Sequence, residues 1–376
     1  LGETTKTILD DVERNAPTRV VFDSMSELRL LAGNALRYRR QILALKQFLA
    51  GRQCTVLMLD DLTGAGHDLQ VLSIVHGALL LEHSLPSYGV QRRQLSVTKY
   101  RGSDFRSGYH DYLIRRGGLE VFPRLVAKEH RHRSSREQLG SGLAELDALL
   151  GGGIERGTST LFAGAAGTGK STLAALFAAI ACARGEHAAM FIFDESANTL
   201  FSRMKGLGLD LAPYAQAGTL YVKQIDPAEL SPGQFVDEVR RAVAERGASV
   251  VIIDSLNGYL QAMPDERSIV IQLHEVLNFL GQQGVASILV AAHAGLIGAA
   301  MTSPLDASYL ADAIVLLRYY EAEGEVRQAI SVIKKRGGAH ERSLRDFSMK
   351  DGRITVGEPL RDYRGVLTGV PEKKGK

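Results

Sequence analysis

A glycine-rich segment in the middle of the chain has the residue types and spacing that bind phosphate. Residues 160–183 read TLFAGAAGTGKSTLAALFAAIACA, in which Gly164, Gly169, Lys170 and Ser171 form the pattern G-x-x-x-x-G-K-S between an apolar strand and a helix. Glycines let backbone amides turn toward phosphate oxygens, the lysine binds the β- and γ-phosphates, and the serine hydroxyl is a ligand for Mg²⁺. A plain glycine turn before a helix is the alternative. The pattern predicts a site for ATP and Mg²⁺.

The residues expected to contact the nucleotide run without interruption through this loop: Gly164, Ala165, Ala166, Gly167, Thr168, Gly169, Lys170, Ser171 and Thr172.

Two other apolar strands are expected to end in carboxylates. Residues 250–254, VVIID, are apolar on both faces, which is typical of a buried parallel strand, and Asp254 is predicted to hold Mg²⁺ through water or Ser171. Residues 188–193, AAMFIF, precede Asp194 and Glu195, of which Glu195 is the predicted general base and Asp194 its neighbour. The alternatives are a solvated acid at the strand end and acids that only cap the following segment.

Candidate cations and a candidate sensor lie at the ends of two further strands. Lys334, Lys335 and Arg336 follow the strand 329–333 and precede a Gly-Gly turn. A cation supplied across a subunit interface stabilises charge in phosphoryl transfer, so these three residues are candidates to complete a neighbouring subunit's site, with a solvated edge as the alternative. His293 ends the strand 287–293 and is a candidate γ-phosphate sensor, although a lone histidine at a strand end more often has a structural role.

Three blocks of sequence recur in the same order. RVVFDSMSEL at 19–28 resembles SVVIIDSLNG at 249–258, LSVTKYRGS at 95–103 resembles ISVIKKRGG at 330–338, and HDYLI at 110–114 corresponds to RDFSM at 345–349. Asp23 and Asp254 are 231 residues apart, and Arg101 and Arg336 are 235 apart. Chance similarity of short apolar strands is the alternative to a repeat.

The repeat predicts two lobes. In the second, Lys170 lies 84 residues before Asp254, and the same spacing before Asp23 would place a loop ahead of Leu1, so the first lobe is expected to be incomplete. The polar, basic stretch RLVAKEHRHRSSREQLGS is interpreted as a solvated connector, with a nucleic-acid contact as the alternative. The predicted organisation is the C-terminal part of a first lobe at 1–123, a linker at 124–140, a complete lobe at 141–363 and a flexible tail at 364–376.

The composition narrows the functional classes. Among 376 residues, 45 basic and 42 acidic side chains leave a net charge of +3, which argues against a surface built for nucleic acid. No apolar run reaches the length of a membrane span, and the first twenty residues are too polar for a signal peptide. Cys54 and Cys182 are too few for a disulfide framework, which favours the reducing cytoplasm.

Together these features resemble the KaiC family of RecA-superfamily ATPases. The residues that carry the resemblance are SGLAELDALLGGGIERGTSTLFAGAAGTGKST at 141–172, the acid pair after AMFIF, VIIDS at 251–255 and VIKKRGGAHERSLRDF at 332–347, and the similarity spans nearly the whole chain. The resemblance implies a double-lobed subunit in a homo-hexameric ring with ATP between subunits. It implies that Lys170, Ser171 and Asp254 bind Mg-ATP, that Glu195 and Asp194 match paired catalytic glutamates, and that Lys334 and Arg336 reach the neighbour's nucleotide.

Two positions depart from the family pattern. The acid pair is Asp-Glu instead of Glu-Glu, and the Ser-Thr pair that the clock member phosphorylates is matched by Ser308-Tyr309, which leaves Ser308 as a candidate phosphosite. The tail after Tyr363 is short, so a clock role is not expected, although signalling proteins remain candidate partners.

The sequence therefore predicts an α/β fold of two tandem RecA-like P-loop NTPase lobes, each a mainly parallel sheet flanked by helices, the first incomplete. The predicted function is slow ATP hydrolysis in a ring, with Ser/Thr autokinase activity as a lesser expectation. A DNA-dependent recombinase or helicase is the first alternative, but residues 295–308 contain no Lys or Arg. A non-catalytic, nucleotide-gated assembly module is the second, and the acid pair argues against it.

Overall fold

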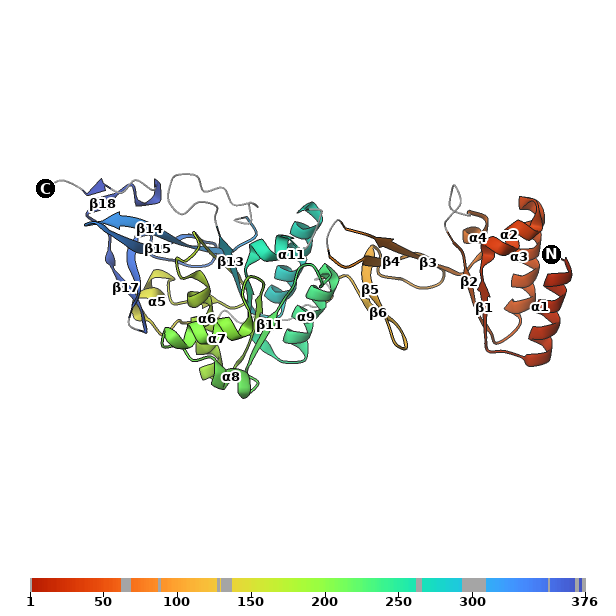
Figure 1. Ribbon diagram of the computed structural model, residues 1–376, viewed down its shortest axis with the longest axis horizontal. Helices are drawn as coiled ribbons and strands as arrows, with labels where there is room; N and C mark the ends of the chain where they lie inside the picture. The colour runs from red at the N-terminus through yellow and green to blue at the C-terminus, as the bar shows by residue number, and fades with distance from the viewer. Residues whose placement is uncertain are drawn as a thin grey trace. The chain divides into compact units, whose positions relative to one another are not determined.

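The computed structural model describes residues 2–61, 69–86, 89–126, 129, 137–261, 266–292, 309–350, 352–368 and 372–373 (Figure 1). The chain divides into two compact units, which we call unit 1 and unit 2. Unit 1 comprises Leu1–Leu80 with Ser96–Gly108, and unit 2 comprises Leu81–Leu95 with Tyr109–Lys376.

Unit 1 contains a short parallel sheet with helices on one face. Strands β1 (Arg19–Asp23) and β2 (Thr55–Leu59) pair in parallel. Its helices are α1 (Gly2–Asn15), α2 (Met25–Ala32), α3 (Ala35–Ala50) and α4 (Leu69–Ile74). Because side chains alternate along a strand, Phe22 faces the buried cluster formed with α2 and α3. On the other face Val21, Leu57 and Leu59 are 56%, 53% and 45% exposed.

Unit 2 is built on a sheet whose described strands follow the order β11-β10-β12-β13-β9-β14-β15-β16-β17. The first six are parallel, and the last three run antiparallel to their neighbours. Their bounds are β9 (Ser159–Gly164), β10 (His187–Ile192), β11 (Leu220–Gln224), β12 (Ala248–Asp254), β13 (Ala286–Ala292), β14 (Ala313–Ala322), β15 (Glu325–Lys335), β16 (Arg345–Lys350) and β17 (Arg353–Pro359).

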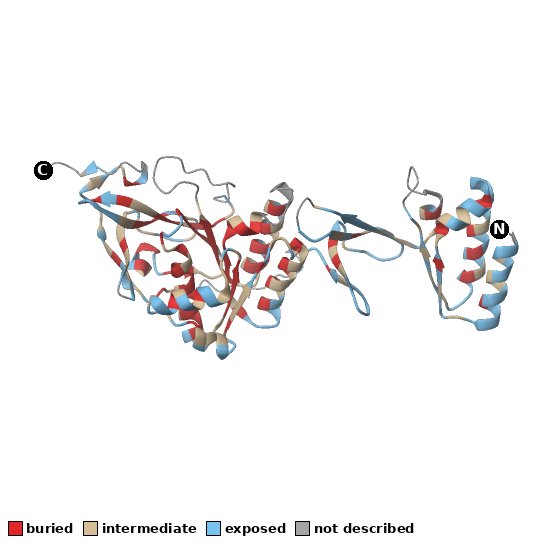
Figure 2. Cartoon of the chain, viewed as in Figure 1, coloured by how far each residue is buried: buried red, intermediate tan, exposed pale blue. Residues whose placement is uncertain are grey.

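Helices cover both faces of this sheet, and the core lies between the layers (Figure 2). The helix α6 (Lys170–Ala183) is rich in alanine and leucine, which favour helix. It covers one face of the sheet, and most of its side chains are buried. On the other face lie α9 (Pro232–Ala244) and α11 (Glu266–Gln282). The helix α9 begins with a capping box, in which Ser231 and Gln234 exchange hydrogen bonds, and with Pro232 in its first turn.

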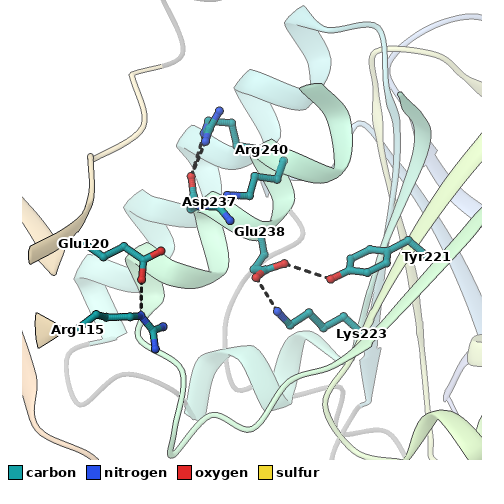
Figure 3. Close-up of polar contacts among 8 residues, drawn as sticks. Arg115, Glu120, Tyr221, Lys223, Asp237, Glu238 and Arg240 are labelled. Carbon is teal, nitrogen blue, oxygen red and sulfur yellow. Dashed lines mark hydrogen bonds and ion pairs between the residues drawn. The ribbon is translucent and has the colours of Figure 1, made fainter. Parts of the chain in front are cut away.

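Polar contacts hold α9 against its neighbours within unit 2 (Figure 3). Glu238 accepts hydrogen bonds from the Tyr221 hydroxyl at 3.2 Å and the Lys223 ammonium at 2.6 Å, which ties α9 to β11. Asp111, on β5 (Tyr109–Arg115), accepts from the Gly233 amide at 2.8 Å, where the first turn of a helix has unpaired donors. The hairpin of β5 and β6 (Gly118–Phe122) is also bridged by Arg115 and Glu120.

The remaining described elements are short. A four-stranded sheet has the order β3-β4-β5-β6, with β3 (Gly77–Ser84) and β4 (Arg92–Tyr100), and two small sheets pair β7 (Gln138–Leu139) with β8 (Ile154–Glu155) and β18 (Tyr363–Arg364) with β19 (Glu372–Lys373). The other helices are α5 (Ala144–Leu149), α7 (Ala197–Gly206), α8 (Ala212–Gln216), α10 (Leu256–Gln261) and the 3₁₀ turn Val366–Thr368. No helix in the described part of the chain is long and apolar enough to cross a membrane.

The predicted fold class is confirmed: the larger sheet is mainly parallel and flanked by helices, and the loop joins a strand to a helix as expected. In that sheet β9 lies between β13 and β14. Among the described residues before Gln138, β1 and β2 form one sheet, and β3, β4, β5 and β6 form a separate one. The lobe boundaries proposed from the repeat stay a prediction.

We expect Ile42→Ala to reduce the free energy of unfolding of unit 1 by about 2–5 kcal/mol, because Ile42 is 1% exposed in its small core and truncation leaves a cavity. Leu36→Ala, on the same helix at a position that is 62% exposed, is the matched control and should change stability by about 0.5 kcal/mol or less. Urea unfolding followed by circular dichroism measures both. Equal effects would show that the assigned core is wrong.

Candidate functional site

The phosphate-binding loop connects the carboxyl end of β9 to the amino end of α6. Gly169 is the N-cap of α6 and has φ = +94°, and Gly167 has φ = +79°, values that favour glycine. A side chain at Gly167 would also meet the Tyr319 hydroxyl, and one at Gly169 would meet Met349. The loop therefore packs closely against β14 and β16. Without side chains at these glycines, its backbone can turn its amides toward a phosphate group.

Lys170 is 6% exposed, and its ammonium donates a hydrogen bond to the Ala165 carbonyl at 2.6 Å. Burial lowers the pKa of Lys170 to about 8, and the negative charge of Asp254 opposes this shift. An ammonium has three donors, so Lys170 can bind phosphate oxygens while it remains bonded to the loop. The Thr168 hydroxyl donates to the same carbonyl at 2.8 Å, which fixes the turn.

Asp254 ends β12 beside this loop and is 8% exposed. The Ser171 hydroxyl donates to its carboxylate, whereas Asp254 Oδ2 is buried without a hydrogen-bond partner among the described residues. Burial, with the charges of Glu195 and Asp194, raises the pKa of Asp254 to about 6. A buried carboxylate oxygen that lacks a partner costs free energy unless a cation or donor reaches it.

These residues fit Mg²⁺. One carboxylate and one hydroxyl are oxygen donors, and Mg²⁺ is usually held by one or two protein oxygens together with substrate phosphates and water. Consistently, the described residues contain no group of three or more His, Cys, Asp or Glu side chains that would form an all-protein metal cage.

The acid pair lies next to Asp254 because β10 and β12 are adjacent, with Ile192 opposite Asp254 in register. Asp194 Oδ2 accepts a hydrogen bond from the Ser255 hydroxyl at 2.5 Å. Glu195 forms an ion pair with Arg203 of α7, in which Oε1 lies 2.5 Å from Nη2 and Oε2 lies 3.3 Å from Nε. Both predicted acids thus lie at the edge of the loop site, and each is bonded to a residue of its own chain.

The three cations at the end of β15 each donate a hydrogen bond to a backbone carbonyl of the same chain. Lys334 donates to the Ala311 carbonyl at 2.8 Å. Lys335, whose side chain is 5% exposed, donates to the Leu150 carbonyl at 2.6 Å. Arg336 donates to the Tyr309 carbonyl at 2.9 Å and pairs with Asp312, but its side chain is 55% exposed. Of the three, Arg336 is the one placed to make further contacts.

The first copy repeats this arrangement within unit 1. There Lys99 donates to the Leu72 carbonyl at 2.5 Å, and Arg101 donates to the Ser73 carbonyl at 3.0 Å. In both pairs the lysine and the arginine donate to backbone carbonyls that precede a strand. For Lys334 and Arg336 that strand is β14, and for Lys99 and Arg101 it is β3.

The structure brings together the loop residues Gly164 to Thr172, Asp254, Asp194 and Glu195. Lys334 and Arg336 bind the segment before β14 instead. Two predicted residues, His293 and Ser308, lie outside the described residues.

Sequence reasoning missed Arg203 and Ser255, the two partners of the acid pair. Arg203 had one weak signal, its place on a helix that follows Glu195 directly. Ser255 had a stronger one, since the Asp-Ser pair recurs as Asp23-Ser24.

Comparisons with known proteins show the family to which the chain belongs. The family model described as "ATPase: KaiC" matches residues 1–126 and 139–361, and the chain therefore belongs to the KaiC ATPase family. The circadian clock protein KaiC3 of Synechocystis sp. is 27% identical over 377 residues, which cover 99% of this chain and 74% of that protein. The circadian clock oscillator protein KaiC of Thermosynechococcus vestitus is 26% identical over 367 residues, 96% of this chain and 70% of the relative.

The circadian clock oscillator protein KaiC of Picosynechococcus sp. is 28% identical over 285 residues, which cover 75% of this chain and 54% of that protein. The chain thus matches about half to three quarters of the length of these relatives.

We expect Asp254→Asn to stabilise the nucleotide-free, metal-free protein at pH 7 by about 1–3 kcal/mol. The pKa of about 6 lies above the ordinary 3.8, so the folded state holds this proton more tightly than the unfolded state. The resulting stability is fully present below about pH 4 and is lost as the pH rises through 6. Asparagine carries no charge and removes this loss.

Urea unfolding of both proteins at pH 4 and pH 7, in the presence of a chelator, measures the effect. Asp362→Asn, at an exposed position of the same unit, is the control. A gain of the same size at both pH values would contradict the assignment of the loss to the buried charge.

Proposed function

We propose that this chain binds Mg-ATP at the Gly164–Ser171 loop and hydrolyses it, as a subunit of a homo-hexameric ring. The observation that carries the proposal is the buried, unpartnered Oδ2 of Asp254 next to Ser171 and Lys170. An unpaired carboxylate at this position lowers stability, and a bound cation reverses that loss. Membership of the KaiC ATPase family supports the same reaction.

In the binding step the loop amides and Lys170 contact the phosphate oxygens, with the positive end of α6 directed at them. Ser171 and Asp254 would hold the Mg²⁺, and its charge would offset that of the β- and γ-phosphates. Because a cation favours the ionised form of a nearby carboxylate, Asp254 would take part in this site as the carboxylate.

In the hydrolytic step Glu195 accepts a proton from a water molecule as the water oxygen bonds to the γ-phosphorus. The bond between the γ-phosphorus and the bridging oxygen breaks, and ADP and phosphate leave. Asp194, held by Ser255, is the adjacent carboxylate and keeps the local field negative, which favours proton transfer to the pair.

Across the ring, Arg336 is proposed to stabilise the charge that develops on the neighbouring subunit's ATP, with Lys334 beside it. The exposure of the Arg336 side chain supports this role. To act on a neighbour, the guanidinium must exchange its contacts with Tyr309 and Asp312 for phosphate oxygens.

Lys170→Ala and Glu195→Gln separate binding from chemistry. Loss of the charged donor should weaken ATP binding about tenfold to a hundredfold, whereas the amide of Glu195→Gln keeps its shape and should retain binding. Hydrolysis by Glu195→Gln should fall by about 10²- to 10⁴-fold because an amide accepts no proton. Equilibrium binding of a fluorescent ATP analogue and steady-state phosphate release measure the two steps.

Incubation with γ-labelled ATP, with and without DNA, tests the competing functions in the same preparation. Release of free phosphate that DNA does not change supports the proposal. Stimulation by DNA would favour a recombinase or helicase, label on Ser308 would add autokinase activity, and binding without either product would leave a nucleotide-gated assembly module.

Mixing two impaired variants tests the action of Arg336 across an interface. Arg336→Ala should bind ATP yet hydrolyse it about a thousandfold more slowly, the range known for such residues. Rings that combine Arg336→Ala with Lys170→Ala subunits contain some interfaces with an intact loop facing an intact arginine, so part of the activity should return. Phosphate release across a series of ratios, with ring formation followed by sedimentation, gives the answer. Mixed rings no more active than either variant would disprove action across the interface.

A further inference from the structure

The Glu195 carboxylate is held at two points by one side chain. Arg203 donates to Oε1 through Nη2 at 2.5 Å and to Oε2 through Nε at 3.3 Å. The third nitrogen of the same guanidinium, Nη1, donates to the Thr172 hydroxyl at 3.2 Å. Arg203 therefore connects the carboxylate that follows β10 to the first turn of the loop helix α6.

Both ends of this connection are fixed by packing. Arg203 lies on α7, which is capped by Ser196 and anchored in the core by Leu200 and Met204, both 0% exposed. Thr172 is 2% exposed and follows Ser171 in α6. Because the guanidinium is planar and its donors have a fixed geometry, a carboxylate that pairs with it in this way has little freedom to turn.

This pairing competes with the role of Glu195 as a base. A carboxylate that accepts from a guanidinium on both oxygens has fewer lone pairs for the proton of an attacking water. The side chains of Arg203 and Glu195 are 35% and 21% exposed, so water can reach and replace the contact. Ion pairs with this access to solvent are weak, and opening one is therefore compatible with turnover.

We propose that Arg203 is a positioning residue that latches Glu195 to the loop helix, and that the latch must open before Glu195 can activate water. The charged groups near this pair are Asp194 and Asp254, and Asp254 interacts with both Glu195 and Arg203. Binding of Mg-ATP would bring new charge to Ser171, one residue before the Thr172 anchor of the latch. This inference rests on the proposed function.

Removal of the latch should increase the rate of hydrolysis. We expect Arg203→Gln to release phosphate about twofold to tenfold faster at saturating ATP, with ATP affinity little changed, because opening an ion pair with this access to solvent costs little free energy. Arg203→Lys should gain less, since an ammonium keeps the charge but cannot bind both oxygens in the guanidinium geometry. The gain should be absent when Glu195→Gln is combined with Arg203→Gln. A faster enzyme is not the result of a damaged fold, so this readout separates the latch from a structural role.

Arg240→Gln is the matched control, because Arg240 also pairs with a carboxylate, Asp237, at 2.7 Å, but lies on α9 (Figure 3). Its rate should equal that of the unchanged protein.

A second measurement does not depend on turnover. Unfolding temperatures of the unchanged protein, Glu195→Gln, Arg203→Gln and the double variant give the coupling between the two side chains. The latch predicts coupling without nucleotide and its loss with Mg²⁺ and a non-hydrolysable ATP analogue. Coupling that persists with the analogue, or Glu195-dependent hydrolysis that slows or stays constant in Arg203→Gln, would overturn the latch alone. Failure of the chain to bind nucleotide would overturn both the proposed function and the latch.

Discussion

The arrangement of unit 2 depends on the parallel pairing of β9 with a strand on each side. Ala163 of β9 lies opposite Ala291 of β13 and Leu316 of β14, so the strand that leads into the phosphate loop is fixed at both edges. Parallel strands bring their carboxyl ends to one edge of the sheet. Asp254 at the end of β12 and the acids after β10 therefore meet the loop because of the topology, although they lie far from it in sequence.

The same constraint explains why the site is electrostatically costly. The core that fixes β9 and β12 also removes Lys170 and Asp254 from water, which moves both pKa values toward neutrality in opposite directions. A more exposed site would be more stable alone but would interact less strongly with phosphates, because water screens charge. Stability in the absence of ligand is thus exchanged for affinity, as is common at functional sites.

Much of the fold and of the loop site could be predicted from the sequence. The apolar runs at 160–163 and 250–254 correspond to β9 and β12, and the run at 188–193 to β10, because strands buried on both faces have a continuous apolar pattern. The meeting of Lys170 with Asp254 followed from the motif and the order of strands. These predictions rest on backbone topology, which local patterns determine well.

The directions in which side chains point could not be predicted as well from the sequence. Arg203 is one of several cations on exposed helices, and no local pattern distinguishes one that turns toward Glu195 from one in solvent. The three cations at 334–336 are adjacent in sequence, yet Lys335 is buried against the Leu150 carbonyl while Arg336 is exposed. Such differences depend on which carbonyl lies within reach after folding, and a single sequence does not contain that information.

The two-stranded sheet of unit 1 has a consequence for the behaviour of the chain in concentrated solution. Among the described residues β2 pairs with β1 on one side only, and its sequence TVLML carries no charge. An uncharged, apolar edge strand offers unpaired amides and carbonyls to any extended segment that approaches it, and natural edges are commonly protected by lysine, proline or a bulge. The strand β2 contains neither lysine nor proline, so among the described residues its second edge is protected by neither of these side chains.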